Sequence, residues 1–164
     1  MGCEMTIEAE IFIRAPLARV WRVFSRLEEW KDWNTACAEC RFVDGDGLDP
    51  GACFAFVVRP LVFPLQVRPR VVSCEPGREV VWEGSRLGIR AVHVWRFRET
   101  GEGVVLSSVE RFRGALLFLG RLLGVPGRMH RLTVRMLEEI RIHCEEGTRP
   151  AGRGEAAGQV PGAV

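Results

Sequence analysis

Residues 103–144 read GVVLSSVERFRGALLFLGRLLGVPGRMHRLTVRMLEEIRIHC, and the period of the apolar residues changes within this stretch. Up to Arg113 the pattern is that of a β-strand with one buried face. After Gly114 the spacing becomes helical, and residues 115–125 are apolar nearly all round. The stretch therefore predicts a strand that leads into C-terminal helical structure.

The second part of this helical region has one apolar face. Pro126-Gly127 is expected to interrupt or kink the helix, because proline lacks an N–H and its ring clashes with the preceding turn. The helix then resumes over residues 128–144 with an apolar face made of Met129, Leu132, Met136, Ile140 and Cys144. Such a helix must bury this face, and the large apolar partner available is the concave side of a sheet.

The N-terminal part predicts a strand followed by two short helices. Residues 6–14 alternate between apolar and polar side chains, which is typical of a half-buried strand. Pro16 is suited to a first helical turn, and Val20, Trp21, Phe24 and Leu27 then recur at helical spacing. A second short helical piece is predicted at 28–33.

Between these regions the sequence predicts an antiparallel meander. The turn-rich segments DGDGLDPG, CEPGRE, GSRLG and ETGEG separate strand-like runs, and connectors of hairpin length favour antiparallel pairing. The runs lie at about 37–43, 52–59, 65–75, 79–84, 89–98 and 103–113. With the first strand they make seven, so the predicted fold class is α+β, with a seven-stranded curved antiparallel sheet and a long C-terminal helix.

The composition is that of one soluble globular domain. The chain has 164 residues, of which 47% are hydrophobic, and its 23 basic and 21 acidic side chains leave a net charge of +2. This balance argues against a nucleic-acid partner, because such domains carry a clustered basic excess. Residues 147–164 are rich in Gly, Ala and Pro without periodicity, so we expect a domain at 1–146 and a disordered tail at 147–164.

The expected location is the cytoplasm. The first residues alternate and carry glutamates, unlike the basic start and unbroken apolar stretch of a signal peptide. The apolar run at 115–125 is shorter than the ~20 residues of a spanning helix, so no stable membrane insertion is expected. The six cysteines are then expected to be reduced thiols.

No metal or cofactor is predicted. Cys37 and Cys40 have the spacing of half a zinc site, but the sequence has no second such pair. In a strand their thiols would also point to opposite faces. Phosphate-binding and dinucleotide-binding glycine motifs are absent from the sequence.

Several short motifs occur in an order that resembles a known superfamily. They are Ile13-x-Ala15-Pro16 with Val20-Trp21, Trp30-x-x-Trp33-Asn34, Glu75-Pro76-Gly77 with Val81-Trp82, His93-x-Trp95-x-Phe97, and Glu110-x-Phe112-x-Gly114. Together they span about residues 6–144 and resemble the START-like helix-grip superfamily (SRPBCC), in particular its polyketide cyclase/dehydrase and lipid transport branch. The resemblance implies that the sheet grips the terminal helix, with a cavity between them for a small, largely apolar ligand. It implies less about activity, because this fold hosts binding proteins, carriers, cyclases and co-chaperone domains.

Two polar residues are expected to face this cavity from neighbouring strands. His93 shares a strand face with Trp95, and Glu110 shares one with Phe112, so the parity that puts the rings inside also puts His93 and Glu110 inside. They could act as acid and base in an aldol-type cyclisation or dehydration, or form a hydrogen-bonded structural pair. Burial would raise the pKa of the glutamate and lower that of the histidine, whereas proximity would favour a charged imidazole.

Other residues are expected to bind the ligand by surrounding it. Trp33 and Asn34 follow the first helices, where the resemblance places one rim of the pocket, and Trp30 is expected to close the core. The rest of the expected ligand-binding wall consists of Phe54, Phe56, Trp82, Trp95, Phe112, Met129, Leu132 and Met136.

The apolar run at 115–125 has two interpretations. Its glycines and its apolar character suit a mobile lid over the pocket, or a patch that makes transient membrane contact to exchange lipid. The run contains one arginine and no lysine-rich polar face, which favours the lid.

Two classes of function follow. The first is binding or transport of a small hydrophobic ligand, such as a lipid, an isoprenoid or a polyketide-like molecule, by a monomer or homodimer. The second is a polyketide aromatase/cyclase or dehydratase in which His93 and Glu110 transfer protons. A protein-binding module is a third class, for which the sequence contains no positive signal.

Overall fold

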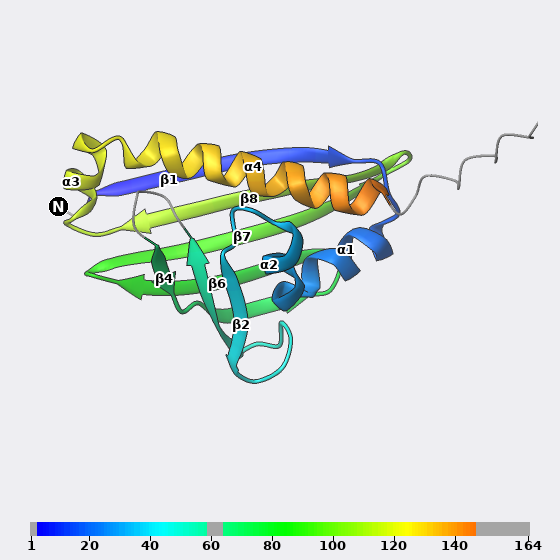
Figure 1. The fold of residues 1–164 in the computed structure, drawn as a ribbon, viewed down its shortest axis with the longest axis horizontal. Helices are drawn as coiled ribbons and strands as arrows, with labels where there is room; N and C mark the ends of the chain where they lie inside the picture. The colour runs from blue at the N-terminus through cyan, green and yellow to red at the C-terminus, as the bar shows by residue number, and fades with distance from the viewer. Residues whose placement is uncertain (1–2, 59–63, 147–164) are drawn as a thin grey trace, which may run out of the picture.

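The computed structural model describes residues 3–58 and 64–146, which form a curved antiparallel sheet with helices on its concave side (Figure 1). The strands follow the order β1-β8-β7-β6-β5-β3-β2, and β4 pairs with β3. They are β1 (Glu4–Ile13), β2 (Glu39–Asp44), β3 (Cys53–Val58), β4 (Leu65–Val67), β5 (Arg70–Glu75), β6 (Glu79–Arg86), β7 (Ile89–Thr100) and β8 (Gly103–Arg113). The helices are α1 (Leu17–Ser25), the 3-10 turn η1 (Leu27–Glu29), α2 (Trp30–Trp33), α3 (Leu117–Leu122) and α4 (Val125–Glu146).

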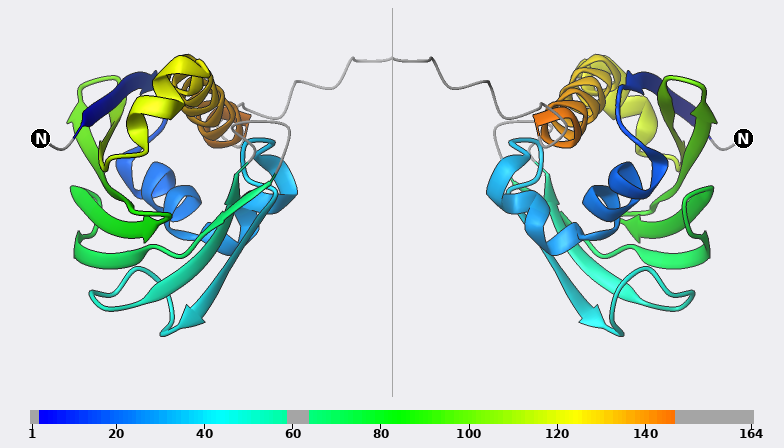
Figure 2. Two further views of the ribbon diagram at one scale, coloured as in Figure 1. Left: turned by 90° about the vertical axis from the view of Figure 1, so that its left-hand side faces the viewer. Right: turned by 90° about the vertical axis from the view of Figure 1, so that its right-hand side faces the viewer.

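The predicted α+β class is confirmed, with α4 as the element that covers the concave face. Figure 2 shows the sheet curving around α4 and α1, and α4 packs beside β1. Leu137, Ile140 and Cys144 of α4 are fully buried, and in β1 the buried Ile7 and Ile13 alternate with exposed glutamates. The helical and strand periods read from the sequence thus set which faces meet.

An aromatic cluster fills the end of the concave face near α1. Phe24 of α1 lies 4.9 Å from Phe97, 5.1 Å from Trp95 and 5.3 Å from Trp30, measured between ring centroids. These contacts are edge-to-face, the arrangement that aromatic quadrupoles favour. Because these rings fill the space between the sheet and the C-terminal half of α4, a cavity is expected toward the N-terminal half of the helix.

Polar contacts fix the C-terminal half of α4. The Arg19 guanidinium donates to the carbonyls of Cys144 and His143 over 2.6 and 3.2 Å, which satisfies acceptors that the helix end leaves open. The backbone N–H of Thr35 donates to the Glu139 carboxylate over 2.7 Å, and that of Arg14 donates to Glu145 over 2.9 Å. The segments after β1 and α2 are thereby held against the helix.

The sheet has eight strands in the described residues, not the predicted seven. The run at 65–75 is divided into β4 and β5 at Arg68-Pro69. Proline has no N–H to donate to a ladder, so one continuous strand through Pro69 is disfavoured. The Pro69 carbonyl accepts from the N–H of Phe54 over 3.1 Å, which keeps both pieces beside β3.

The break in the C-terminal helical region was predicted at Pro126-Gly127 and lies instead at Leu123-Gly124. Gly124 has a φ of +69°, a left-handed conformation that glycine adopts without steric cost and that ends a helix. Pro126 lies in the first turn of α4, where its missing N–H leaves no hydrogen bond unmade.

The predicted tail at 147–164 lies outside the described residues. In the part of the chain that the structure does describe, no helix is long and apolar enough to span a bilayer.

Gly114, which follows β8, should not tolerate a side chain. A Cβ at this position would lie 2.5 Å from the backbone oxygen of Gly88, in the turn between β6 and β7. We expect Gly114→Ala to lower the free energy of unfolding by about 1–3 kcal/mol, because the backbone must shift to relieve the overlap. Chemical denaturation measures this loss.

Gly101→Ala is the matched control, because a Cβ there has no atom within 4 Å. The control should change the free energy of unfolding by less than about 0.5 kcal/mol. Equal losses in the two variants would contradict the close approach at Gly114.

Candidate functional site

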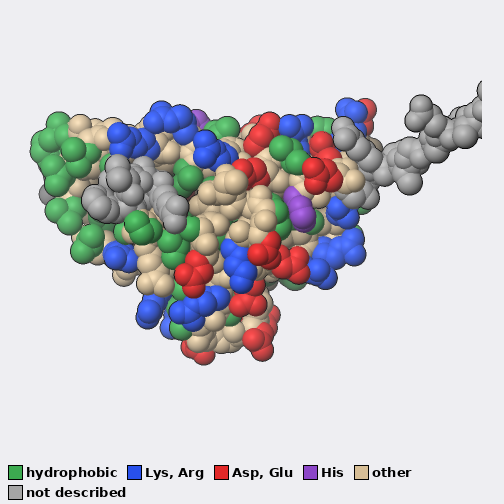
Figure 3. All heavy atoms as spheres, viewed as in Figure 1, with side chains coloured by type: hydrophobic (Ala, Val, Ile, Leu, Met, Phe, Trp, Pro, Cys, Tyr) green, Lys and Arg blue, Asp and Glu red, His purple; other side chains and the backbone are tan. Residues whose placement is uncertain are grey.

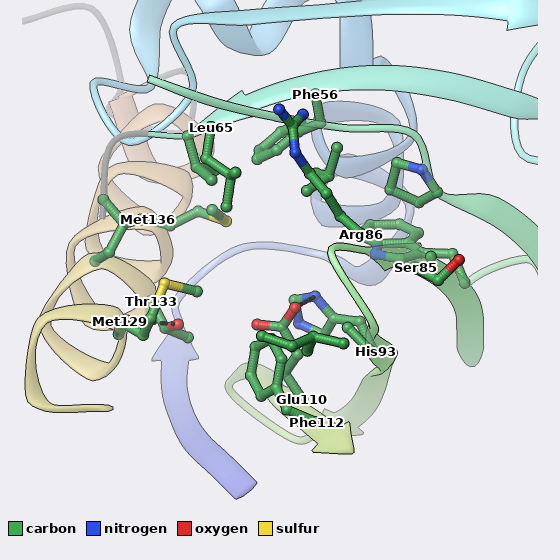
Figure 4. Close-up of a pocket in the computed structure, with 18 of the residues that line it drawn as sticks. Phe56, Leu65, Ser85, Arg86, His93, Glu110, Phe112, Met129, Thr133 and Met136 are labelled. Atoms are coloured by element: carbon green, nitrogen blue, oxygen red, sulfur yellow. Dashed lines mark hydrogen bonds and ion pairs between the residues drawn. The ribbon is translucent and has the colours of Figure 1, made fainter. Parts of the chain in front are cut away.

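A cavity with a volume of about 240 Å³ lies between the concave face of the sheet and α4. Most of its wall is aliphatic or aromatic (Figure 4). The polar side chains at this wall are Ser85, Arg86, His93, Glu110 and Thr133. An apolar enclosure with a small number of convergent polar groups is the usual form of a small-molecule site.

His93 and Glu110 form the polar centre of the cavity. They are directly opposite each other on β7 and β8, so both side chains leave the sheet on its concave side. His93 Nδ1 lies 3.9 Å from Glu110 Oε1, and His93 Nε2 lies 2.7 Å from the hydroxyl oxygen of the buried Ser108. Figure 4 shows the imidazole and the carboxyl group side by side, facing the α4 side chains Met129 and Thr133.

Desolvation controls the charge of this pair. The His93 and Glu110 side chains are only 11% and 18% exposed. Burial lowers the pKa of His93 to about 3 and raises the pKa of Glu110 to about 7. The histidine is therefore neutral at physiological pH, and the glutamate exchanges its proton near neutrality.

The indole of Trp95 lies behind the polar centre of the cavity. Trp95 is fully buried, and its Nε1 has no hydrogen-bond partner among the described residues and no exposed surface. Its ring stacks on His93 with 4.5 Å between centroids, and Trp82 packs against His93 at 5.4 Å. The indole therefore supports the imidazole from behind, and its N–H does not face the cavity.

Residues 4–145 match the protein family described as polyketide cyclase / dehydrase and lipid transport. The chain belongs to this family. The family resemblance read from the motifs is thereby confirmed, whereas the ligand and the activity of this member are not established by membership. No curated protein sequence matches the chain.

Solved structures with the same fold include cyclases as well as other proteins. A protein of Thermus thermophilus has a TM-score of 0.75 and 17% identity, covering 88% of this chain and 100% of its own. The Zhui aromatase/cyclase of Streptomyces sp. R1128 has a TM-score of 0.75 and 14% identity, covering 92% and 99%. Norcoclaurine synthase of Thalictrum flavum, in complex with dopamine and hydroxybenzaldehyde, has a TM-score of 0.67 and 14% identity, covering 88% of each chain. At these identities the likeness establishes the fold of the family member and not its activity.

Most of the residues predicted to surround the ligand do lie at the cavity wall. Those at the wall are Phe54, Phe56, Trp82, His93, Trp95, Glu110, Phe112, Met129, Leu132 and Met136. Trp30, expected only to close the core, is buried and also reaches this wall. A binding role for each of them stays a prediction.

Trp33 and Asn34 do not lie at the cavity wall, contrary to prediction. The Trp33 ring stacks on His143 of α4, with 4.5 Å between centroids and 5° between planes. The buried Asn34 amide donates to the Met136 carbonyl over 3.3 Å and accepts from the Ala36 N–H over 3.1 Å. Both side chains hold the segment after α2 against α4, together with the hydrogen bonds of Thr35 to Glu139.

A second set of wall residues was not predicted from the sequence. Ile89 and Ala91 share the strand parity of His93, and Val125 and Thr133 share the helix face of Met129, so the same periods could have found them. No period identifies the residues of the β6–β7 turn. The missed set is Met5, Leu27, Val58, Leu65, Val67, Pro69, Gly84, Ser85, Arg86, Leu87, Ile89, Ala91, Leu117, Val125 and Thr133.

Cys37 and Cys40 lie side by side, contrary to the prediction that their thiols face opposite ways. Cys37 precedes β2, in a turn closed by its N–H donating to the Asn34 carbonyl over 3.0 Å. Both cysteines are buried, and a thiol hydrogen bond between them lowers the pKa of Cys37 and raises that of Cys40. Within the described residues no group of three metal-ligating side chains surrounds them.

Glu110→Gln should stabilise the protein increasingly as the pH rises. The pKa of Glu110 is about 7 in the folded protein and 4.5 ordinarily, so unfolding releases its proton between these values. By linkage, the wild type loses stability through this window, and the variant does not. Its excess free energy of unfolding should grow from zero below pH 4.5 to roughly 3 kcal/mol above pH 7.

Urea denaturation over a pH series measures this difference. His93 has the opposite sign, because its lowered pKa makes the folded state gain stability as the pH rises from about 3 to 6.5. That contribution is common to both proteins and cancels in the comparison. Glu99→Gln, at an exposed glutamate of β7, is the control, and a pH-independent gain in E110Q would contradict the proton exchange.

Proposed function

We propose that this chain binds a compact, largely apolar molecule that carries a neutral hydrogen-bonding group. The observation that carries the proposal is the apolar cavity with His93 and Glu110 at one wall. Burying a ligand in a preformed apolar pocket is favourable by roughly 25 cal/mol per Å² of apolar surface, before the costs of association. The family description, which includes lipid transport, supports the same interpretation.

The charge state of the wall limits the class of ligand. Glu110 repels an anionic group when ionised, and a neutral His93 supplies no compensating positive charge. The Arg86 guanidinium, at the same wall, is engaged instead with the Gln66 carbonyl, to which it donates. A carbonyl or phenolic oxygen suits the site better, because it accepts from a protonated carboxyl group, and a phenolic hydroxyl also donates to an ionised one. The volume of about 240 Å³ is below the ~300–1,000 Å³ common for ligand pockets, which favours a compact ring system over a long acyl chain.

Three bicyclic probes test this proposal by isothermal titration at pH 7.5. We expect 2-naphthol to bind more tightly than naphthalene, and 2-naphthoate to bind most weakly. Glu110→Leu keeps a similar volume but removes the polar group, so it should weaken 2-naphthol about tenfold, the value of one hydrogen bond, without weakening naphthalene. Equal affinity of the variant and the wild type for 2-naphthol would remove Glu110 from the site.

Glu99→Leu is the matched control, because Glu99 is an exposed residue of β7 that does not lie at the cavity wall. It should leave all three affinities unchanged. Failure of every probe to bind the wild-type protein would contradict the binding proposal as a whole.

A second candidate function, proton transfer in a cyclisation or dehydration, is favoured by the position of Glu110. A cavity carboxyl group with a pKa of about 7 holds and releases a proton near the operating pH, as general acid–base catalysis requires. Its protonated form would give the proton to a substrate carbonyl oxygen, and its ionised form would take one from the neighbouring carbon. His93, bonded to Ser108, would position the carboxyl group beside it. The similarity in fold to an aromatase/cyclase makes this candidate worth testing.

Turnover of a poly-β-ketone surrogate distinguishes an enzyme from a binding protein. If Glu110 transfers protons, Glu110→Gln should lower kcat by about 10²–10⁴-fold, and His93→Ala should lower it as well. Affinity for naphthalene serves as the control, because it reports an intact cavity without using the polar groups. No turnover by the wild-type protein would leave binding as the function, whereas wild-type turnover in E110Q would show that Glu110 does not transfer the proton.

A further inference from the structure

One end of the molecule exposes a cluster of large apolar side chains. They are Leu87 of the β6–β7 turn with Leu116, Phe118, Leu119, Leu122 and Leu123 of α3 and its flanks, and their exposed fractions are 50–73%. We call these six residues the apolar tip. The turn and the start of α3 are adjacent, because Gly114 lies against the backbone of Gly88 and Ile89. Contiguous apolar exposure of this kind marks an interaction site more often than solitary exposed leucines do.

Arginines without carboxylate partners lie next to the apolar tip. Residues 111–137 include six arginines and no aspartate or glutamate. Arg128, Arg131 and Arg135 form one exposed stripe on α4, and within the described residues no carboxylate lies within 4.0 Å of their guanidinium groups. Figure 3 shows hydrophobic side chains at the α3 end of the molecule, basic side chains next to them and most acidic side chains farther away.

The charge at the start of α4 runs against the dipole of the helix. Arg128 lies in the first turn, where the dipole favours anions, and this turn has no acidic side chain. The Arg128 charge therefore gains no stability from the dipole. An anionic surface next to the N-terminal half of α4 would reverse the electrostatic penalty there.

The apolar tip is continuous with the cavity. Leu87 belongs to the tip and also to the cavity wall, and the wall continues under the tip through Leu117, Val125 and Met129. Leu117 turns inward and packs with Met5 and Ile7, so α3 has one buried apolar side and one exposed apolar side. An apolar molecule could pass along this wall without crossing open water.

We propose that the apolar tip docks on the surface of a bilayer containing anionic lipid, with the arginines of α4 at the level of the phosphates. A bilayer offers both chemistries in the observed order, because acyl chains receive the leucines and Phe118 while the head groups meet the arginine stripe. The run at 115–125 contains a single arginine, too little positive charge to attract an anionic membrane by itself. The arginines of α4 supply the additional positive charge. Docking itself does not depend on the proposed function. The further inference that docking serves exchange of the cavity ligand rests on that function.

Vesicle flotation with the full chain tests the proposal. We expect binding to vesicles of equal parts phosphatidylcholine and phosphatidylglycerol, weaker binding to phosphatidylcholine alone, and release at high salt. The variant R128Q/R131Q/R135Q should lose about a hundredfold in partition to the anionic vesicles, at roughly fivefold per arginine. The variant F118S/L119S/L122S should lose binding to both kinds of vesicle.

Matched variants control for charge and for loss of apolar surface. The charge control, R14Q/R22Q/R98Q, removes three exposed arginines outside α3, α4 and the β6–β7 turn. The apolar control, Val72→Ser, removes a half-exposed apolar side chain of β5. Both variants should bind vesicles like the wild type. Two results would overturn the proposal and leave the apolar tip to a lid or to a protein partner. One is wild-type partition of both R128Q/R131Q/R135Q and F118S/L119S/L122S, and the other is no binding of the wild-type chain to either vesicle. Affinity for 2-naphthol separates membrane docking from the proposed ligand binding. A protein that binds vesicles but not 2-naphthol would contradict the proposed function alone. A protein that binds 2-naphthol but not vesicles would contradict docking alone.

Discussion

The packing of α4 across a sheet more curved than the helix is the constraint on which the rest of the structure depends. A straight helix cannot follow a concave surface along its whole length, so contact at one end leaves space at the other. Here the aromatic cluster around Phe24 fills one end, and the cavity occupies the space toward Met129. Larger side chains in α4 or a flatter sheet would remove the cavity without changing the order of the elements.

Inside this space the dielectric environment decides the chemistry. The cross-strand register sets His93 beside Glu110, and an exposed pair in that position would be a charged ion pair. Burial makes both charged forms costly, so the neutral imidazole and the exchangeable carboxyl proton follow from where the pair lies and not from its residue types.

Local periodicity predicted the parts of this molecule that depend on it. The alternation in β1 and the apolar face of α4 identified which residues turn inward, and the parity of β7 and β8 placed His93 and Glu110 correctly. The errors concern features for which no period exists. Pro69 divides a strand, Gly124 instead of Pro126 ends a helix, and Trp33 and Asn34 bind α4 across a long sequence separation. Cys37 and Cys40 meet because a turn precedes β2, and the wall residues of the β6–β7 turn depend on tertiary packing in the same way.

The hydrogen bonds that tie α4 to the rest of the protein are unevenly placed along it. In the described part of the chain they join residues 136–145 of the helix to Arg14, Arg19, Asn34 and Thr35. The half that begins at Val125 is held by apolar contacts, including that of Met129 with the cluster of Met5, Ile7 and Leu117. Directional bonds tolerate little displacement, whereas apolar side chains can slide and repack. The C-terminal half of α4 is thus anchored more rigidly than its N-terminal half. The cavity can therefore widen around an occupant at the N-terminal half of the helix while the aromatic cluster stays in place.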